Sequence, residues 1–466
     1  VSVTAFVANT GTVAARAGIQ GSIEQDRQAV ASIQIPEQEI PPGQIVEFQT
    51  QIPIPAAKLV LWQLDRPALY NVSLSTTGST IMNVQRTFGI RKIEARNAQL
   101  LLNGNPIRLG GANRVVDDPQ YASLEPPSVV DRDLRQMKEA GMELMRMAHY
   151  PLSPVVLDWA DRHGLLLIEE AGNWGLPEQQ LDSPVIRTKL QVMAKEMIQR
   201  DWNHPSIIGW SVGNEYASNL PAGLRWTRDM RQYFRSIDST RLITFADNHF
   251  WSGNVHRGED DGSFYSDLVG INPYGSVSSV AQRLDLIHKF YPEKPVLLTE
   301  WGIRNNQVKN EADRQRYAEQ VIAEIRKRPW IVGASLWTYN DYRSRFPGTA
   351  ANGLRPWGAV HYDRTPYPLY ETLRNEFSPV IVSGILEENG KSIVICRARP
   401  DFPSKDISGY RVLLGNDESR PIPDLHPGAE ARIVFNTPAK GKTVAIERPG
   451  GFRSFLSDSA ALEHIQ

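Results

Sequence analysis

Residues 207–215 read IIGWSVGNE, an apolar run that ends in a carboxylate. Residues 296–302 read VLLTEWG and have the same form. Short apolar runs of this kind are typical of the buried strands of a parallel sheet. In a closed barrel of eight parallel strands all strands open onto one face, so Glu215 and Glu300 can converge there.

The sequence around these two runs alternates between apolar segments and longer helical stretches, such as residues 129–140 and 311–326. This alternation indicates parallel βα units. Eight candidate strands fit a closed barrel better than an open doubly wound sheet, and no glycine-rich nucleotide loop follows the first of them. The candidate strands are residues 107–111, 144–148, 165–169, 207–211, 242–245, 268–271, 296–299 and 332–337.

On both sides of the predicted barrel the sequence pattern differs from that of the barrel. It consists of short β-type runs separated by turn residues. Such spacing is typical of β-sandwiches. We therefore predict three domains: a β-sandwich over residues 1–94, a (β/α)₈ TIM barrel over residues 95–377, and a second small β-sandwich over residues 378–466.

Composition narrows the classes of partner. The 51 Lys and Arg residues nearly balance the 52 Asp and Glu residues, and the net charge of -1 gives no reason to expect nucleic acid or an anionic membrane as a partner. No apolar stretch is long enough to span a bilayer, and no signal peptide is visible. The single cysteine, Cys396, lies in an alternating run and is interpreted as a packed core thiol.

Two opposed carboxyl groups are the basic equipment of glycoside hydrolysis. The retaining form of the reaction needs one carboxyl group that is protonated, to assist departure of the leaving group, and one that is ionised, to attack the anomeric carbon. The two groups stand roughly 5–5.5 Å apart. A single strand-end glutamate has a simpler alternative, as a solvated loop residue or a salt-bridge partner.

Several further motifs occur in a fixed order along the chain. They are Arg66-Pro67-Ala68-Leu69-Tyr70, Phe88-Gly89-Ile90-Arg91, Asn103-Gly104-Asn105-Pro106-Ile107, Gly110-Gly111-Ala112-Asn113-Arg114, His149-Tyr150-Pro151 and Asn203-His204-Pro205-Ser206. Together these motifs make residues 1–377 resemble glycoside hydrolase family 2, the group of β-galactosidases, β-glucuronidases and β-mannosidases. The resemblance implies an immunoglobulin-like fold for the N-terminal sandwich.

The resemblance assigns the general acid/base to Glu215 and the nucleophile to Glu300. It implies that Asn214 bonds the sugar 2-hydroxyl; the alternative is a cap on the loop. Tyr274 matches the family tyrosine that contacts the nucleophile. Arg146 matches an arginine whose guanidinium would favour the charged carboxylate of Glu300.

Three more residues have open roles. His149 lies in the family-like His-Tyr-Pro turn and is expected either to contact sugar or to be structural. Trp337 and Trp301 could offer flat faces to a sugar ring, or could simply fill the core. Glu169 and Glu170 are adjacent in a strand and face opposite ways, so we interpret them as supporting or structural residues.

The sequence departs from the family pattern after the first strand. Family members commonly have a histidine and a glutamate there, whereas Asn113-Arg114 is followed by two valines before Asp117, so a usual contact to the sugar is absent. Asn113 and Asp117 are kept as supporting candidates.

The loop after the eighth strand also lacks the Asn-x-Lys motif of typical β-glucuronidases. It carries three arginines instead, Arg343, Arg345 and Arg355. They are expected either to pair with Asp341 or Asp363 or to bind an acidic sugar.

The start of the chain raises a further expectation. It begins at Val1 rather than Met, and the N-terminal sugar-binding-like domain of the family is apparently missing, which is typical of a processed or truncated chain. We expect a periplasmic or secreted location rather than a cytoplasmic one.

The sequence thus predicts a retaining exo-β-glycosidase that removes a terminal β-linked sugar from an oligo- or polysaccharide. A β-galactosidase-like activity is placed first, and a β-glucuronidase or β-galacturonidase is the alternative. A noncatalytic carbohydrate-binding protein is the second alternative. The sequence does not require a cofactor and shows no set of metal ligands. Mg²⁺ is implied by the family resemblance alone. The sequence leaves open whether the chain forms a homo-oligomer.

Overall fold

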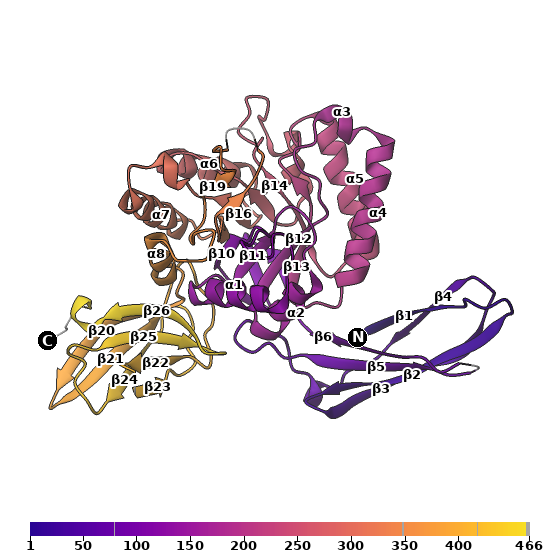
Figure 1. The fold of residues 1–466 in the computed structure, drawn as a ribbon, viewed down its shortest axis with the longest axis horizontal. Coiled ribbons are helices and arrows are strands. Elements are labelled where there is room, and N and C mark those ends of the chain that lie inside the picture. Colours follow the sequence, from indigo (N-terminus) through magenta and orange to yellow (C-terminus); the bar gives the residue numbers. More distant parts are fainter. Residues whose placement is uncertain (79, 347–348, 417, 463–466) are drawn as a thin grey trace. The chain divides into compact units, whose positions relative to one another are not determined.

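A computed structural model describes residues 1–78, 80–346, 349–416 and 418–462. The chain divides into two compact units (Figure 1). The first comprises residues 1–63, 67–91 and 203–205, and the second comprises residues 64–66, 92–202 and 206–466. No helix in the described ranges is both long enough and apolar enough to cross a bilayer.

The first unit is built from antiparallel strands. β1 (Ser2–Ala8) pairs with β4 (Ile45–Gln51), and a four-stranded sheet has the order β3-β2-β5-β6. Its members are β2 (Ala15–Gln25), β3 (Gln28–Ile40), β5 (Tyr70–Thr76) and β6 (Asn83–Phe88). A short 3₁₀ helix, η1 (Ala56–Lys58), lies between β4 and β5 in the sequence. The antiparallel β architecture agrees with the prediction, while the immunoglobulin-like assignment and the boundary at residue 94 stay predictions.

A small antiparallel sheet leads into the barrel. It consists of β7 (Ile93–Arg96), β8 (Gln99–Leu102) and β9 (Asn105–Ile107). Asn103 and Gly104 join the last two strands with φ values of 54° and 87°. A two-residue hairpin turn needs positive φ at both positions, which Asn-Gly adopts most readily.

Eight parallel strands close into a barrel in sequence order, so the predicted TIM barrel is present. Each strand overlaps a predicted segment, and β13, β14 and β16 extend two or three residues past their apolar runs. The strands are β10 (Leu109–Asn113), β11 (Leu144–Met147), β12 (Leu166–Glu170), β13 (Ile207–Asn214), β14 (Leu242–Asp247), β15 (Val269–Ile271), β16 (Val296–Trp301) and β17 (Ile331–Trp337).

Helices between the strands cover the outside of the barrel (Figure 1). They are α1 (Pro127–Glu139), α2 (Pro154–His163), α3 (Glu178–Leu181), α4 (Pro184–Asp201), α5 (Pro221–Ile237), α6 (Val277–Phe290), α7 (Glu311–Arg326) and α8 (Pro368–Glu376). Short turns η2 (Gly258–Asp260), η3 (Gly262–Tyr265) and η4 (Asn305–Gln307) lie in the loops, with a two-stranded ribbon of β18 (Tyr342–Arg343) and β19 (Leu354–Arg355).

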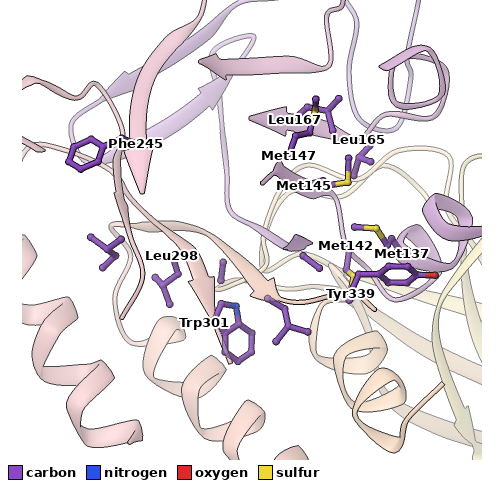
Figure 2. Packing of buried hydrophobic residues seen from close by; sticks show 14 of the residues in the cluster. Met137, Met142, Met145, Met147, Leu165, Leu167, Phe245, Leu298, Trp301 and Tyr339 are labelled. Carbon is purple, nitrogen blue, oxygen red and sulfur yellow. The ribbon is translucent and has the colours of Figure 1, made fainter. Parts of the chain in front are cut away.

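The main core fills the space between the strands and this helical layer. Figure 2 shows part of it, with Met145 and Met147 of β11, Leu167 of β12 and Met137 of α1. Burial of such side chains contributes about 1.5–3 kcal/mol each. This core holds the strands rigidly, so side chains at their carboxyl ends have fixed positions.

The C-terminal part of the second unit has two antiparallel sheets and a separate core that includes Cys396. Burial raises the pKa of the Cys396 thiol to about 12, as expected for a packed thiol. One sheet holds β20 (Val380–Glu388), β21 (Lys391–Ala398) and β24 (Glu430–Phe435). The other holds β22 (Arg411–Leu414), β23 (Glu418–Pro421), β25 (Thr443–Arg448) and β26 (Phe452–Asp458), with η5 (Ser459–Ala461) after it.

Candidate active site

A cavity of about 750 Å³ opens at the carboxyl ends of the barrel strands, and both Glu215 and Glu300 line it. A TIM barrel builds its ligand sites at this end. The other lining residues are His149, Trp174, Asn214, Asn248, Tyr274, Gly275, Ser276, Gly302, Ile303, Arg304, Gln307, Tyr317, Trp337, Phe346, Arg355 and Trp357.

Glu300 lies near the end of β16 and is held by two donors. Arg146 Nη1 donates to its Oε1 over 2.8 Å, and the Tyr274 hydroxyl donates to its Oε2 over 2.7 Å. Burial, followed by the negative charge of Glu300, raises the pKa of Tyr274 well above its usual value, so the phenol keeps the proton that it donates. The two bonds fix the plane of the Glu300 carboxyl group.

Arg146 is fully buried and joins several of the predicted residues. Its Nη2 donates to Glu170 Oε2 over 2.9 Å and to Asn214 Oδ1 over 2.8 Å, and it lies 3.1 Å from His149 Nδ1. Burial works against the charged form of Glu170, but the charge of Arg146 and the hydrogen bonds with His149 and Ser211 together outweigh burial and lower the Glu170 pKa to about 2. Glu170 therefore supports residues around the cavity through its bonds to Arg146 and His149.

Glu169 points to the other side of β12, as the alternation of a strand requires. It lies 3.4 Å from Arg200, and burial together with Asp201 raises its pKa well above the usual value. The interpretation of this acidic pair as supporting residues agrees with their positions on opposite faces of the strand.

Glu215 follows β13 directly, at the rim of the barrel, with φ of 47°. Its side chain is partly buried. Burial, and then the charge of Glu300, raises the Glu215 pKa, which favours the protonated form. The two carboxyl groups of the cavity thus have different surroundings, since Glu300 is bound by a cation and a phenol.

Asn272 was missed by the sequence analysis, although it stands two residues before Tyr274. Its Nδ2 donates to Glu215 Oε1 over 2.8 Å. The Thr299 hydroxyl donates to Asn272 Oδ1 over 2.6 Å and so fixes which end of the amide faces Glu215. The position of Asn272, directly after the sixth strand, was the signal available in the sequence.

The glycine before Asn214 shapes the end of β13. Gly213 has φ of 146°, and a Cβ added there would lie 2.6 Å from Asn173 Nδ2. The register between β13 and β14 shifts between Ser211 and Asn214. This irregularity brings Asn214 and Glu215 to the cavity together.

The two predicted tryptophans have different positions. Trp337, at the end of β17, lines the cavity and stacks on His149 with ring centroids 5.5 Å apart. Of the two alternatives left open for Trp301, the structure agrees with the core role, because Trp301 is fully buried in the main core (Figure 2). It follows Glu300 in an extended strand, so its side chain points away from the cavity.

The three arginines of the last loop do not gather at one place. Arg355 lines the cavity, whereas the Arg343 guanidinium lies over the Tyr362 ring and Arg345 is exposed outside the cavity lining. Pairing of Tyr342 with Arg355 across the β18–β19 ribbon puts Arg343 on the opposite face. The proposed partner Asp341 instead accepts hydrogen bonds from Tyr367 and from the Gly358 amide.

Asn113 and Asp117 lie outside the cavity lining. Asn113 is fully buried and donates to the Thr299 carbonyl over 2.9 Å, so it supports the strand that carries Glu300. Asp117 accepts from the Arg343 amide over 2.6 Å and from the Tyr362 hydroxyl over 3.0 Å. Asn113 thus supports a barrel strand and Asp117 supports the loops, and neither lines the cavity.

In the described part of the chain, no group of three or more His, Cys, Asp or Glu side chains is placed to hold a metal ion.

A family model for the TIM barrel domain of glycosyl hydrolases family 2 matches residues 93–381. The chain belongs to glycosyl hydrolase family 2. The family 2 chain is 27% identical over 383 residues to a β-glucuronidase of Chlorocebus aethiops, covering 71% of this chain and 58% of that protein. It is 32% identical over 203 residues to β-galactosidase 2 of Enterobacter cloacae, covering 42% of this chain and 19% of that protein.

Among solved structures, a family 2 β-galacturonidase from Eisenbergiella tayi bound to galacturonate has the same fold, with a TM-score of 0.73 at 23% identity. That match covers 81% of this chain and 69% of the other. The chain spans little more than half the length of the curated β-glucuronidases that it matches.

Proposed function

We propose that this family 2 protein is a retaining exo-β-glycosidase that removes a terminal β-linked uronic acid. The observation that carries the proposal is the composition of one cavity. It holds two carboxyl groups in different surroundings, Glu215 and Glu300, and two arginines, Arg304 and Arg355. The first pair suits hydrolysis of a glycosidic bond, and the second pair suits a sugar that carries a carboxylate.

In the first step, a carboxylate oxygen of Glu300 attacks the anomeric carbon and forms a glycosyl ester. The bond from that carbon to the glycosidic oxygen breaks, and Glu215 gives its proton to the departing oxygen. The raised pKa of Glu215 supports the role of proton donor. Arg146 and Tyr274 would hold Glu300 in line for attack.

In the second step, water replaces the leaving group. Formation of the ester removes the negative charge of Glu300, which was one of the causes of the raised Glu215 pKa. Glu215 then takes a proton from the water, the water oxygen bonds to the anomeric carbon, and the ester bond to Glu300 breaks. Two inversions at one carbon leave the product with the β configuration of the substrate.

The two arginines favour an acidic sugar. The Arg304 guanidinium lies over the Trp357 ring, and the Arg355 guanidinium lies over the Phe346 and Tyr342 rings. Neither forms an ion pair with a carboxylate of the described residues, and Arg304 Nε is buried without a hydrogen-bond partner among them. Unpaired cations in a cavity favour an anionic ligand.

The similar proteins also support a uronic acid as the sugar that is removed. The first six curated relatives are β-glucuronidases, and the structural neighbours include a β-galacturonidase bound to galacturonate. We therefore place the β-uronide activity first and the β-galactoside activity, which the sequence analysis had placed first, second.

We also propose an immunoglobulin-like fold for the N-terminal β-rich part, with domain boundaries near residues 94 and 377. The antiparallel sheets at both ends of the chain support this division.

The proposed function is tested with fluorogenic β-glucuronide, β-galacturonide, β-galactoside, β-glucoside and β-mannoside substrates. Wild type is expected to cleave a uronide with the highest kcat/KM, and Glu300→Gln is expected to be inactive. Equal or faster cleavage of a neutral glycoside would overturn the uronide assignment. Binding of sugars without turnover would favour the noncatalytic alternative.

A further inference from the structure

A row of aromatic rings runs along one side of the cavity. The His149 ring stacks on Trp337 with centroids 5.5 Å apart and an angle of 20°, and on Trp174 with centroids 6.0 Å apart and an angle of 12°. Phe346 continues the row, with its centroid 5.8 Å from that of Trp174. All four side chains line the cavity.

The outer end of this row is exposed to solvent. Trp174 is 49% exposed and Phe346 is 42% exposed, and no other tryptophan of the described residues exceeds the exposure of Trp174. Large aromatic rings are usually buried, because their apolar area is stabilised away from water. Exposed apolar patches beside a cavity commonly mark ligand-binding surfaces.

The position of Trp174 indicates which half of the substrate this surface contacts. The Asn214 amide donates to the Asn173 carbonyl over 2.7 Å, and the Gly175 amide donates to the Asn214 carbonyl over 2.8 Å. The backbone at Trp174 is thus held beside Asn214, the residue that precedes Glu215. Since the proton of Glu215 goes to the glycosidic oxygen, the leaving group lies on the Glu215 side of the bond.

We propose that Trp174 and Phe346 form a leaving-group subsite, which stacks on the flat face of the ring attached to the glycosidic oxygen. The ligand is a pyranose or an aryl group, because both present an uncharged flat face to an aromatic ring. The inference rests on the proposed function, since a leaving group exists only if the chain cleaves glycosides.

The test compares three substrates with one glycone, the sugar that wild type cleaves best. They are a glycosyl fluoride, which has no leaving-group ring, an aryl glycoside and a disaccharide. Trp174→Ala is expected to lower kcat/KM about tenfold for a ring-bearing substrate and less than about twofold for the fluoride. Phe346→Ala, whose ring also packs against the Arg355 guanidinium, is expected to lower kcat/KM more for the ring-bearing substrates than for the fluoride. Trp174→Phe is expected to keep most of the activity. Phe264→Ala, at an exposed aromatic outside the cavity lining, is the matched control.

Loss on the disaccharide alone identifies a sugar subsite, and loss on the aryl glycoside alone identifies an aryl subsite. Equal loss on all three substrates would overturn the proposal, because Trp174 would then act through His149 on the glycone. Unchanged rates for both alanine variants would also overturn it.

The substrate panel separates this inference from the proposed function. If wild type cleaves a neutral glycoside, only the uronide assignment fails and the same comparison is made with that sugar. If wild type cleaves no glycoside, the inference fails together with the proposed function.

Discussion

At the scale of single residues, the amide of Asn272 adjusts the proposed acid. Its hydrogen bond lowers the Glu215 pKa, against the larger effects of burial and Glu300. Asn272→Ala should therefore raise that pKa further. Because Glu215 must be protonated to act as the acid, the alkaline limb of kcat/KM against pH should move to higher pH, and kcat/KM at its optimum should fall about 5–10-fold.

The measurement is the pH profile of kcat/KM for wild type, Asn272→Ala and Thr299→Val. Thr299→Val removes only the hydroxyl that orients the amide, so it should move the limb in the same direction by less. A limb that moves to lower pH in either variant would contradict the account.

Arg355 gives a second prediction about a single residue, because its expected effect depends on one charge. Arg355→Gln should lower kcat/KM for a uronide about 10–100-fold, since a hydrogen bond to a charged group contributes about 1.5–3 kcal/mol. Cleavage of the matching neutral glycoside should change little. Arg345→Gln, on the same loop but exposed, is the control. An equal loss on both substrates would show that Arg355 only supports the loop.

Site residues were predictable from the sequence where they lie at, or shortly after, the end of a strand. Glu215, Glu300, Tyr274 and Trp337 all line the cavity because strand ends converge on one face of the barrel. Residues on loops were harder. Only Arg355 of the three arginines reaches the cavity, because the β18–β19 ribbon sets which side of the loop faces inward.

At the scale of elements, the end of β13 depends on Gly213. Its φ of 146° is rarely adopted by other residues, and a Cβ there would overlap Asn173. Gly213→Ala should destabilise the fold by about 1–3 kcal/mol and lower kcat by misplacing Glu215. Gly209→Ala is the control in the same strand, because its Cβ would meet neighbours at 3.5 Å, an ordinary contact.

Thermal unfolding and steady-state kinetics of both variants check this prediction. Similar kcat and stability for Gly213→Ala and Gly209→Ala would mean that neither activity nor stability requires the backbone geometry at the end of β13.

The barrel strands were predictable because each is a short apolar run between helical patterns. β2 and β3 were not anticipated, because their sequences mix polar residues with isolated apolar ones along half-exposed strands. The sheet that each strand joins depends on contacts distant in the sequence, which local pattern does not contain.

At the scale of the whole molecule, a buried cluster of charges links the barrel to the C-terminal sheets within the second unit. Glu143, just before β11, lies 2.5 Å from Arg448 Nη2, 3.4 Å from Lys138 Nζ and 3.6 Å from Lys405 Nζ. Burial opposes the charge of Glu143, but these cations outweigh burial and lower its pKa to about 2.

Glu143→Gln should therefore leave Arg448 and Lys405 buried without this carboxylate, and it also removes a charge that raises the pKa of Lys138, which burial lowers to about 7. The expected loss is about 3–5 kcal/mol in the free energy of unfolding at neutral pH. Because the Glu143 pKa is lower in the folded chain, its stabilising effect is complete above the ordinary value of 4.5 and is lost as pH falls towards 2.

The melting temperatures of wild type and Glu143→Gln, measured from neutral to acidic pH, test both statements. The difference between the melting temperatures of wild type and Glu143→Gln should become smaller below about pH 4.5. Glu94→Gln, which removes an exposed pair with Lys92, should change stability little, because an exposed ion pair contributes little. A Glu143→Gln protein as stable as wild type would show that the cluster does not hold the two parts together.

The central claim for the molecule is hydrolysis through a covalent intermediate on Glu300. The most direct measurement is mass spectrometry of the protein after reaction with the 2-deoxy-2-fluoro glycosyl fluoride of its best glycone, which slows both steps and traps the ester. The account predicts one added sugar on the peptide that contains Glu300 and none on Glu300→Gln. An active enzyme that forms no adduct, or an adduct on another residue, would contradict it.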